Sequence, residues 1–458
     1  NRGVASSQAY RHKFDNKSPD DLPHDKAKEA LKWLSRELDD ALLKFIKQAQ
    51  KNDTLLCCFY EFRYLPVATE IQLAIKRGVD VKLIVDGKAN EHTDKSGKFH
   101  ESFPRVDNLK TIRDAQIDMA HVIVREARTN SIQHNKFMVL LKGTQKQPTE
   151  VWTGSTNLSI GGIHGQTNVG HWVRDEETAK HYQAYWEIIR QDPGSRDSDS
   201  SAEGRKKNKD LRTAVEGLCT VPLTTEDIPA GITTSFSPRI GLKVLDMFVS
   251  MVDTAESSAH ITLAFGVNKA FKEQLQNNTA NSPVVFLLLE KKDTPNPRST
   301  QPFVVINSSN NVYKAWGSFI DQPIYQWARE TNARIMQINK HVSYIHSKFL
   351  LMDPLSTDPI VVTGSANFSE NSITENDENM LIIRGDQRVA DIYLTEFNRI
   401  FNHYYFRSVL ATTKTSAMTA ADESLFLRET ADEWLVKYKQ GTMKQKRVDL
   451  YAHMKGFS

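Results

Sequence analysis

Apolar side chains recur along residues 25–46 with the 3.6-residue spacing of an amphipathic helix, and the spacing returns in the second half from Ile240 to Met251. In both halves this pattern is followed by a short apolar run typical of a strand, a second helical pattern and a further strand. The predicted elements are 25–46, 54–59, 67–77 and 81–85 in the first half, and 240–251, 260–265, 269–277 and 284–289 in the second.

Both halves then carry the same polar motif. His134 and Lys136 stand two residues apart in the first half, as His346 and Lys348 do in the second. Each pair is followed by Gly-Ser-x-Asn, whose serine and asparagine are Ser155 and Asn157 in the first half and Ser365 and Asn367 in the second. Because order, spacing and residue type all agree, we interpret the chain as a duplicated α/β unit.

The boundary between the halves is visible in the composition. The stretch 192–201 is polar and contains proline, glycine and several serines, which is typical of a linker or exposed loop. Basic clusters follow at 205–209 and, near the C-terminus, at 437–447. We predict four regions: an N-terminal lobe 1–192, a linker 193–230, a C-terminal lobe 231–408 and a helical extension 409–458.

Composition narrows the class of protein. The 458 residues include 59 basic and 56 acidic side chains, a net charge of +3 that gives no global attraction to nucleic acid or anionic lipid. No apolar run approaches the roughly 18 residues that span a bilayer. Three cysteines imply no disulfide framework and no metal site. We expect a soluble protein; because the first residue is Asn1, secretion and a cytoplasmic location both stay open.

The repeated His-x-Lys pair has a chemical interpretation. Side chains at i and i+2 of a strand share a face, so each histidine should project together with its lysine. One imidazole can attack phosphorus while the other donates and accepts the proton of the leaving and entering oxygens. The lysines would neutralise the phosphate oxygens. This chemistry requires no metal and no cofactor.

The arrangement resembles the phospholipase D superfamily, whose signature is H-x-K-x-x-x-x-D followed by G-S-x-N. The second half fits fully, with Asp353 as the motif acid, whereas the first half has Leu141 at that position. The resemblance covers roughly residues 25–405. It implies a bilobal, duplicated α-β-α sandwich with mixed sheets, a pseudo-two-fold axis and one active site at the lobe interface. It also implies that Asp353 supports structure.

The resemblance further implies roles for the two histidines: His134 as nucleophile and His346 as general acid and base. Eleven residues past Asn367 lies Glu378, which resembles the family's histidine-orienting acid; the corresponding residue of the first half is Asn168. Our hypothesis is that Glu378 orients one histidine, while Asn168 offers the other a neutral hydrogen bond and thereby lowers its pKa.

The substrate is open at this stage. The first hypothesis is a phospholipase D that hydrolyses phosphatidylcholine-like lipids at a membrane surface, or transfers the phosphatidyl group to an alcohol. The second is a metal-independent nuclease of the same superfamily, with DNA or RNA as its substrate, and the third is an inactive scaffold. Trp152 and Trp172 would serve as core or as apolar walls for acyl chains. We expect a monomer with an internal pseudo-dimer.

Overall fold

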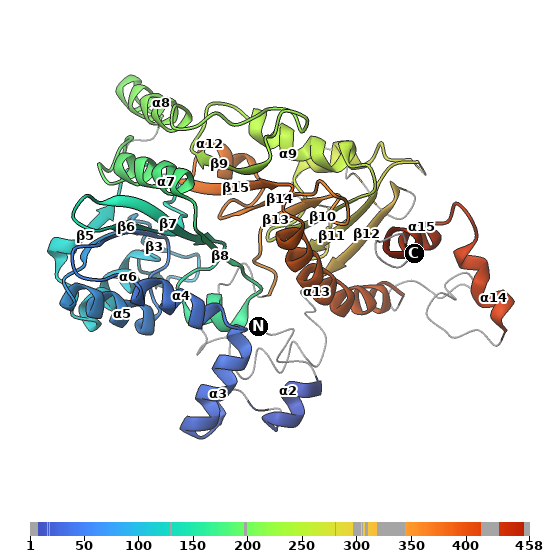
Figure 1. Cartoon of the computed structure of the whole chain (residues 1–458), viewed down its shortest axis with the longest axis horizontal. Helices are drawn as coiled ribbons and strands as arrows, with labels where there is room; N and C mark the ends of the chain where they lie inside the picture. Colours follow the sequence, from blue (N-terminus) through green and yellow to red (C-terminus); the bar gives the residue numbers. More distant parts are fainter. Residues whose placement is uncertain are drawn as a thin grey trace.

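The protein consists of two α/β lobes that lie side by side, each built on a mixed sheet (Figure 1). This arrangement confirms the predicted duplicated fold. The computed structural model describes residues 8–15, 17, 19–128, 131–196, 199–279, 281–295, 304, 306, 310–317, 344–413 and 430–452.

The sheet of the first lobe has the order β5-β2-β1-β6-β7-β8. The strands β1, β2 and β5 run parallel, and β6, β7 and β8 continue the sheet antiparallel from β1. Their bounds are β1 Thr54–Phe59, β2 Asp80–Asp86, β5 Val122–Arg125, β6 Lys136–Lys142, β7 Gln147–Gly154 and β8 Gly170–Val173, beside a small hairpin of β3 His92–Thr93 and β4 Phe99–His100.

The second lobe repeats this order as β12-β11-β10-β13-β14-β15 and adds β9 at the far edge. The same parallel and antiparallel pairings recur, so β10 corresponds to β1 and β13 to β6. The bounds are β9 Gly231–Ser237, β10 Ser258–Leu263, β11 Val284–Leu289, β12 Val312–Trp316, β13 Phe349–Met352, β14 Ile360–Gly364 and β15 Glu378–Arg384.

Helices cover both faces of each sheet. In Figure 1, α4, α5 and α6 lie on one face of the first sheet and α7 on the other, while α9 and α13 take the two faces of the second. A single apolar cluster runs through both lobes, joining Trp186 of α7 to Phe236 of β9 and Phe397 of α13. The main bounds are α4 Leu38–Lys47, α5 Leu65–Lys76, α6 Arg105–Asp114, α7 Glu176–Ile189, α9 Lys243–Thr254, α10 Lys269–Leu275, α12 Glu370–Thr374 and α13 Gln387–Thr413.

One predicted helix is in fact two helices. The pattern at 25–46 forms two helices, α3 His24–Ser35 and α4, because the chain breaks between them. Arg36 and Glu37 both take the left-handed conformation, with φ of 49° and 70°. Non-glycine residues rarely adopt this region, and apolar periodicity alone does not reveal such a break.

The motif acid Asp353 holds two strand ends together. Its buried carboxylate accepts the backbone N–H groups of 256, 257 and 258, at 2.8, 2.7 and 3.0 Å, where the chain enters β10. In the first lobe Leu141 packs into the core instead. Asp53, which precedes β1, joins the same two strand ends there by accepting the Gly143 N–H at 2.9 Å. The lobe therefore keeps this connection without the motif aspartate.

The region predicted as a linker contains a helix, α8 Ala202–Glu216, capped by the Ser201 hydroxyl. Its basic cluster is partly paired on the helix itself, through Lys206–Asp210 at 3.1 Å and Lys207–Glu203 at 2.7 Å. Such exposed pairs are typical of a solvated helix face. The stretch 192–201, where we expected a loop, lies outside any helix or strand where it is described, and α8 begins directly after it.

The C-terminal extension is helical where it is described, with α14 Ala431–Leu435 and α15 Met443–Ala452. The Tyr313 hydroxyl of β12 donates to the Met443 carbonyl at 3.0 Å, and Arg447 lies over the Tyr313 ring. This docking covers an edge of the second sheet. Within the described residues, every helix is too short or too polar to cross a bilayer.

The contacts of Asp353 predict a stability effect. Asp353→Ala leaves three backbone N–H groups without their acceptor, of which only that of Ser258 is buried, so the loss is roughly 2 kcal/mol or about 4–8 °C in Tm. Scanning calorimetry of the purified chain measures this change. Asp358→Ala is the control, because it removes only the exposed pair with Arg384 and should change stability by less than about 1 kcal/mol. Equal Tm values for both variants would contradict the structural role.

Candidate active site

The two His-x-Lys motifs meet at the lobe interface. Lys136 is the first residue of β6, opposite Phe59 at the end of β1. His134 lies two residues before the strand and not within it, and the Lys136 amine donates to its carbonyl. Both motifs therefore lie at the carboxyl ends of the parallel strands, the edge where open α/β sheets bind ligands.

Each lobe pairs its motif with the backbone of the other lobe. His134 donates its N–H to the Asp377 carbonyl at 2.9 Å, and Asp377 donates to the Ile132 carbonyl at 3.0 Å. In the second motif, His346 donates to the Thr167 carbonyl at 3.2 Å, and Thr167 donates to the Tyr344 carbonyl at 2.6 Å. These two parallel bridges are related by the pseudo-two-fold axis and bring the motifs together.

Glu378 binds His134 across the interface. Its Oε2 lies 2.9 Å from His134 Nδ1, and both side chains are buried. Burial lowers the pKa of His134 to about 4, although the Glu378 charge opposes that shift. Burial would raise the pKa of Glu378, but the hydrogen bond from His134 and the charge of Lys136 outweigh it, and its pKa is lowered. At neutral pH the carboxylate is therefore ionised and holds a neutral imidazole with Nε2 free.

Asn168 takes the equivalent place beside His346, with 2.8 Å between its Oδ1 and Nδ1. The Asn168 amide nitrogen donates to the Gly162 carbonyl at 2.8 Å, which fixes the orientation of the amide. Because Oδ1 can only accept, His346 Nδ1 must carry the hydrogen. Burial, followed by the charges of Lys348 and Lys136, lowers the pKa of His346 well below its usual value. The structure therefore contains the arrangement of the hypothesis, in which one histidine has a charged partner and the other has a neutral partner.

The two lysines are buried beside the histidines. Burial lowers the pKa of Lys136 to about 8 and that of Lys348 well below its usual value. The charges of Glu378 and Glu61 oppose this shift for both lysines. A phosphate monoanion between them would favour their charged forms and draw both ammonium groups to its oxygens.

The serines of the Gly-Ser-x-Asn segments position the orienting residues. Ser155 donates to Asn168 Oδ1 at 2.9 Å. Ser365 accepts the Asn379 N–H at 3.0 Å, next to Glu378, and its hydroxyl also stabilises the Glu378 carboxylate. Asn367 lies nearby and donates its backbone N–H to Ser372 at 3.1 Å.

Glu61 is a carboxylate of this site that the repeat did not reveal. It is 1% exposed and accepts the amide of Asn157 at 2.8 Å. Arg63 pairs with it at 2.6 Å and also binds Asp107. The equivalent position after β10 is Phe265, so Glu61 has no counterpart that a comparison of the two halves could find.

A second pair that the sequence did not reveal joins the lobes. Arg125 at the end of β5 donates to Asp377 with 3.0 Å between Nε and Oδ2, and both side chains are buried. Asp377 is the residue whose backbone holds His134, so this ion pair fixes the loop that precedes Glu378. The described residues contain no cluster of three or more histidine, cysteine, aspartate or glutamate side chains placed to hold a metal ion.

The charge of Glu61 predicts a pH effect on anion binding. Glu61→Gln keeps an acceptor for Asn157 but removes the charge that raises the pKa of Lys136 and Lys348. In the wild-type protein, sulfate affinity should fall as the pH rises through the pKa of Lys136. In the variant, the midpoint of this loss should lie about one pH unit lower. Calorimetric titration with sulfate between pH 6 and 10 measures this. Asp107→Asn, which touches the same Arg63, is the matched control, and an identical shift in both variants would refute a direct charge effect.

The neutral partner of His346 predicts a second pH effect. Asn168→Asp places a carboxylate beside Nδ1 and raises the pKa of His346, so a step that needs protonated His346 persists to higher pH. The alkaline limb of kcat/KM for a dialkyl phosphodiester should move up by about one to two pH units. Because the new oxygen also faces the Gly162 carbonyl, Tm is measured in parallel. An unmoved limb in a folded variant would disprove the role of Asn168.

Among solved structures, the chain is similar to phosphatidylserine synthase from Haemophilus influenzae Rd KW20, with a TM-score of 0.50 and 13% identity over 86% of this chain and 94% of that one. It is also similar to polyphosphate kinase from Porphyromonas gingivalis (TM-score 0.47, 9% identity, 78% and 48% covered) and to Nuc, a phospholipase D family member from Salmonella typhimurium (0.26, 17%, 38% and 95%). No curated protein matches the chain.

A sequence model decides the family. The model described as "Cardiolipin synthase, PLD-like domain" matches residues 42–189 and 248–401, one segment in each lobe. These segments take in more than half of the chain and contain both His-x-Lys motifs. The chain therefore belongs to this family of the phospholipase D superfamily of phosphodiester-cleaving and phosphoryl-transferring enzymes.

Proposed function

We propose that the protein is a phospholipase D that cleaves the head group from phosphatidylcholine-like lipids, through a covalent phosphohistidine at His134. The observation that carries this proposal is the paired arrangement of the two histidines. Glu378 leaves His134 Nε2 free and unprotonated, while Asn168 holds the second imidazole in the same tautomer. One nitrogen can thus attack while the other handles the proton.

The first step forms the covalent intermediate. His134 Nε2 attacks phosphorus, and the bond from phosphorus to the head-group oxygen breaks. The leaving oxygen takes a proton from His346 Nε2, which the bound phosphate charge has favoured in its protonated form. Lys136 and Lys348 stabilise the charge on the non-bridging oxygens throughout the step.

The second step returns the enzyme to its starting state. Neutral His346 removes a proton from water, and the resulting hydroxide oxygen bonds to phosphorus as the bond to His134 Nε2 breaks. The products are phosphatidate and a free neutral His134. An alcohol in place of water would give the transphosphatidylation product by the same proton movement.

Exposed aromatic residues near the site support a lipid substrate. Phe99 and Phe103 lie in the segment after β2, and Phe265 follows β10, with exposed fractions of 62%, 36% and 62%. The Phe103 ring is 6.4 Å from that of Tyr60, which in turn is 5.0 Å from the His134 ring. Exposed phenyl rings beside a catalytic centre suit contact with the apolar part of a membrane surface.

The charges of the site support a substrate with one negative charge. Lys136 and Lys348 face Glu378 and Glu61. Arg63 neutralises Glu61 and also pairs with Asp107, which is partly exposed and screened by solvent, so the two lysines beside Glu378 leave a net charge of about +1 at the buried centre. One phosphodiester balances this charge. A nucleic acid would need a further basic groove, and the basic cluster of α8 is partly neutralised by its own acids.

The experiment is choline release from phosphatidylcholine vesicles in the presence of EDTA. Wild-type protein should release choline, His134→Ala should lose all measurable activity, and His346→Ala should lose roughly 10²–10⁴-fold. His24→Ala is the control, because His24 is fully exposed and distant in sequence from both motifs. Each variant is checked for folding by its Tm.

Two outcomes would redirect the assignment. Activity in His134→Ala equal to wild type would rule out the covalent step at this residue. Absence of choline release together with histidine-dependent cleavage of single-stranded DNA would replace the lipase by a nuclease, and steep inhibition by salt would accompany that result.

A further inference from the structure

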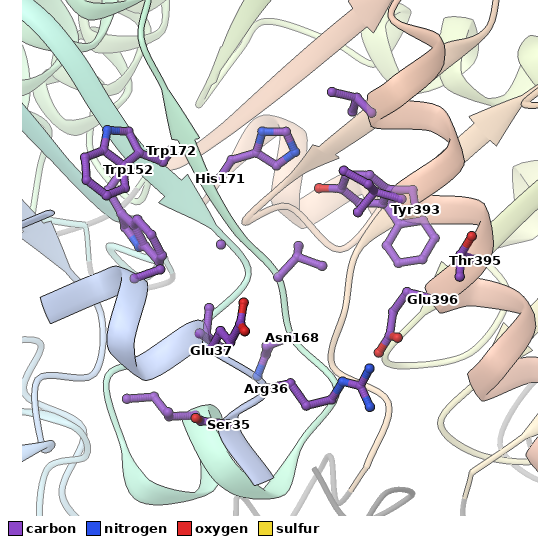
Figure 2. A pocket seen from close by; sticks show the side chains of 18 of the residues that line it. Ser35, Arg36, Glu37, Trp152, Asn168, His171, Trp172, Tyr393, Thr395 and Glu396 are labelled. Atoms are coloured by element: carbon purple, nitrogen blue, oxygen red, sulfur yellow. The ribbon is translucent and has the colours of Figure 1, made fainter. Parts of the chain in front are cut away.

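A cavity lies between the lobes, beside the two His-x-Lys motifs but not among them. Its volume is about 760 Å³, within the range of roughly 300–1,000 Å³ typical of small-molecule sites. One wall comes from the start of α4 and from β7 and β8, and the other from α13 (Figure 2). None of the four motif histidines and lysines lines it.

The walls of the cavity are mainly apolar and aromatic. Trp152 and Trp172 form the side of the first lobe, and Tyr393 and Ile392 the side of the second. Tyr393 stacks on His171 with 5.5 Å between ring centroids, and burial lowers the pKa of His171 to about 4, so this imidazole is neutral. Such walls favour an aliphatic chain over a polar ligand.

Charged side chains of both signs line the cavity: Arg36 is basic, and Glu37, Asp391 and Glu396 are acidic, with Glu396 paired to Arg399. Arg36 and Glu37, the two residues that break the predicted helix, both line it and are exposed. Figure 2 shows Arg36 extending across the opening toward α13, with Glu37 on the opposite side. Among the described residues neither side chain makes an ion pair. Their left-handed backbone costs energy, and such strain often accompanies binding sites.

We infer that this cavity is an accessory binding site for a zwitterionic, single-chain amphiphile of the lysophosphatidylcholine type. The acyl chain would lie between the tryptophans and Ile392. The phosphate would pair with Arg36 and the quaternary ammonium with Glu37. An anionic chain would meet the carboxylates of Glu37, Asp391 and Glu396 as well as Arg36, so charge complementarity favours a zwitterion over an anion.

The cavity touches one residue of the proposed catalytic apparatus. Asn168 lines it, and the same side chain accepts from His346 at 2.8 Å. An amphiphile in the cavity would therefore contact the residue that orients His346. This binding site does not depend on the proposed lipase reaction, because a nuclease with the same cavity would bind the same probe.

The test measures binding in the His134→Ala background, where turnover cannot interfere. Lysophosphatidylcholine with bromine atoms on its acyl chain, kept below its micelle concentration, should quench tryptophan fluorescence saturably. Ala41→Phe, which fills the space beside the tryptophans, should weaken binding at least tenfold. Arg36→Gln should weaken it about tenfold, whereas Lys44→Gln, an exposed charge on the same side of the molecule outside the cavity, should not.

Several results would overturn the inference. Equal affinity in Ala41→Phe and in its parent would place the probe elsewhere. Equal losses of affinity in Arg36→Gln and Lys44→Gln would show that the effect comes from the overall charge of the protein and not from a contact with Arg36. Tighter binding of brominated palmitate than of the brominated zwitterion would contradict the charge assignment at the mouth. Because Arg36 is exposed, its variant is expected to fold even if Ala41→Phe does not.

Discussion

Each of the two motif histidines is held by the other lobe, and the rest of the site depends on that exchange. The backbone of Asp377 pairs with the His134 segment, and that of Thr167 pairs with the His346 segment. The same two segments then supply Glu378 and Asn168 to the imidazoles. A lobe on its own would contain a histidine and a lysine without the partner that fixes the tautomer. The continuous apolar core through α7, β9 and α13 keeps the lobes in that register.

Much of this arrangement could be predicted from the sequence, because duplication makes each half a check on the other. The strands predicted at 54–59 and 284–289 are β1 and β11, and the motif residues meet as the fold requires. What escaped prediction has no internal counterpart. Glu61 corresponds to Phe265, Arg125 binds Asp377 across the interface, and the left-handed turn at Arg36 interrupts an otherwise regular apolar spacing. Pairings between segments far apart in the sequence leave no periodic trace along either one.

The departures from symmetry act on charge more than on shape. Leu141 in place of a motif acid is balanced by Asp53, which joins the same strand ends from the opposite side. Asn168 in place of a carboxylate is not balanced in this way, since its amide preserves the hydrogen bond to His346 but supplies no charge. Glu61 adds charge to the first lobe at a different position, beside the lysines. The backbone fold thus keeps its pseudo-two-fold symmetry, whereas the distribution of charge around the two histidines does not.

The joining of both lobes in one chain gives that one-sidedness an evolutionary meaning. In a symmetric pair of identical one-lobe subunits, every substitution occurs twice, so a carboxylate lost beside one histidine is lost beside both. Fusion after gene duplication removes this restriction, because each copy of an ancestral residue can then be selected separately. Glu378 and Asn168 stand at equivalent places and differ, which two identical subunits could never achieve. The covalent connection between the lobes therefore allows two residues that descend from the same ancestral position to take different roles.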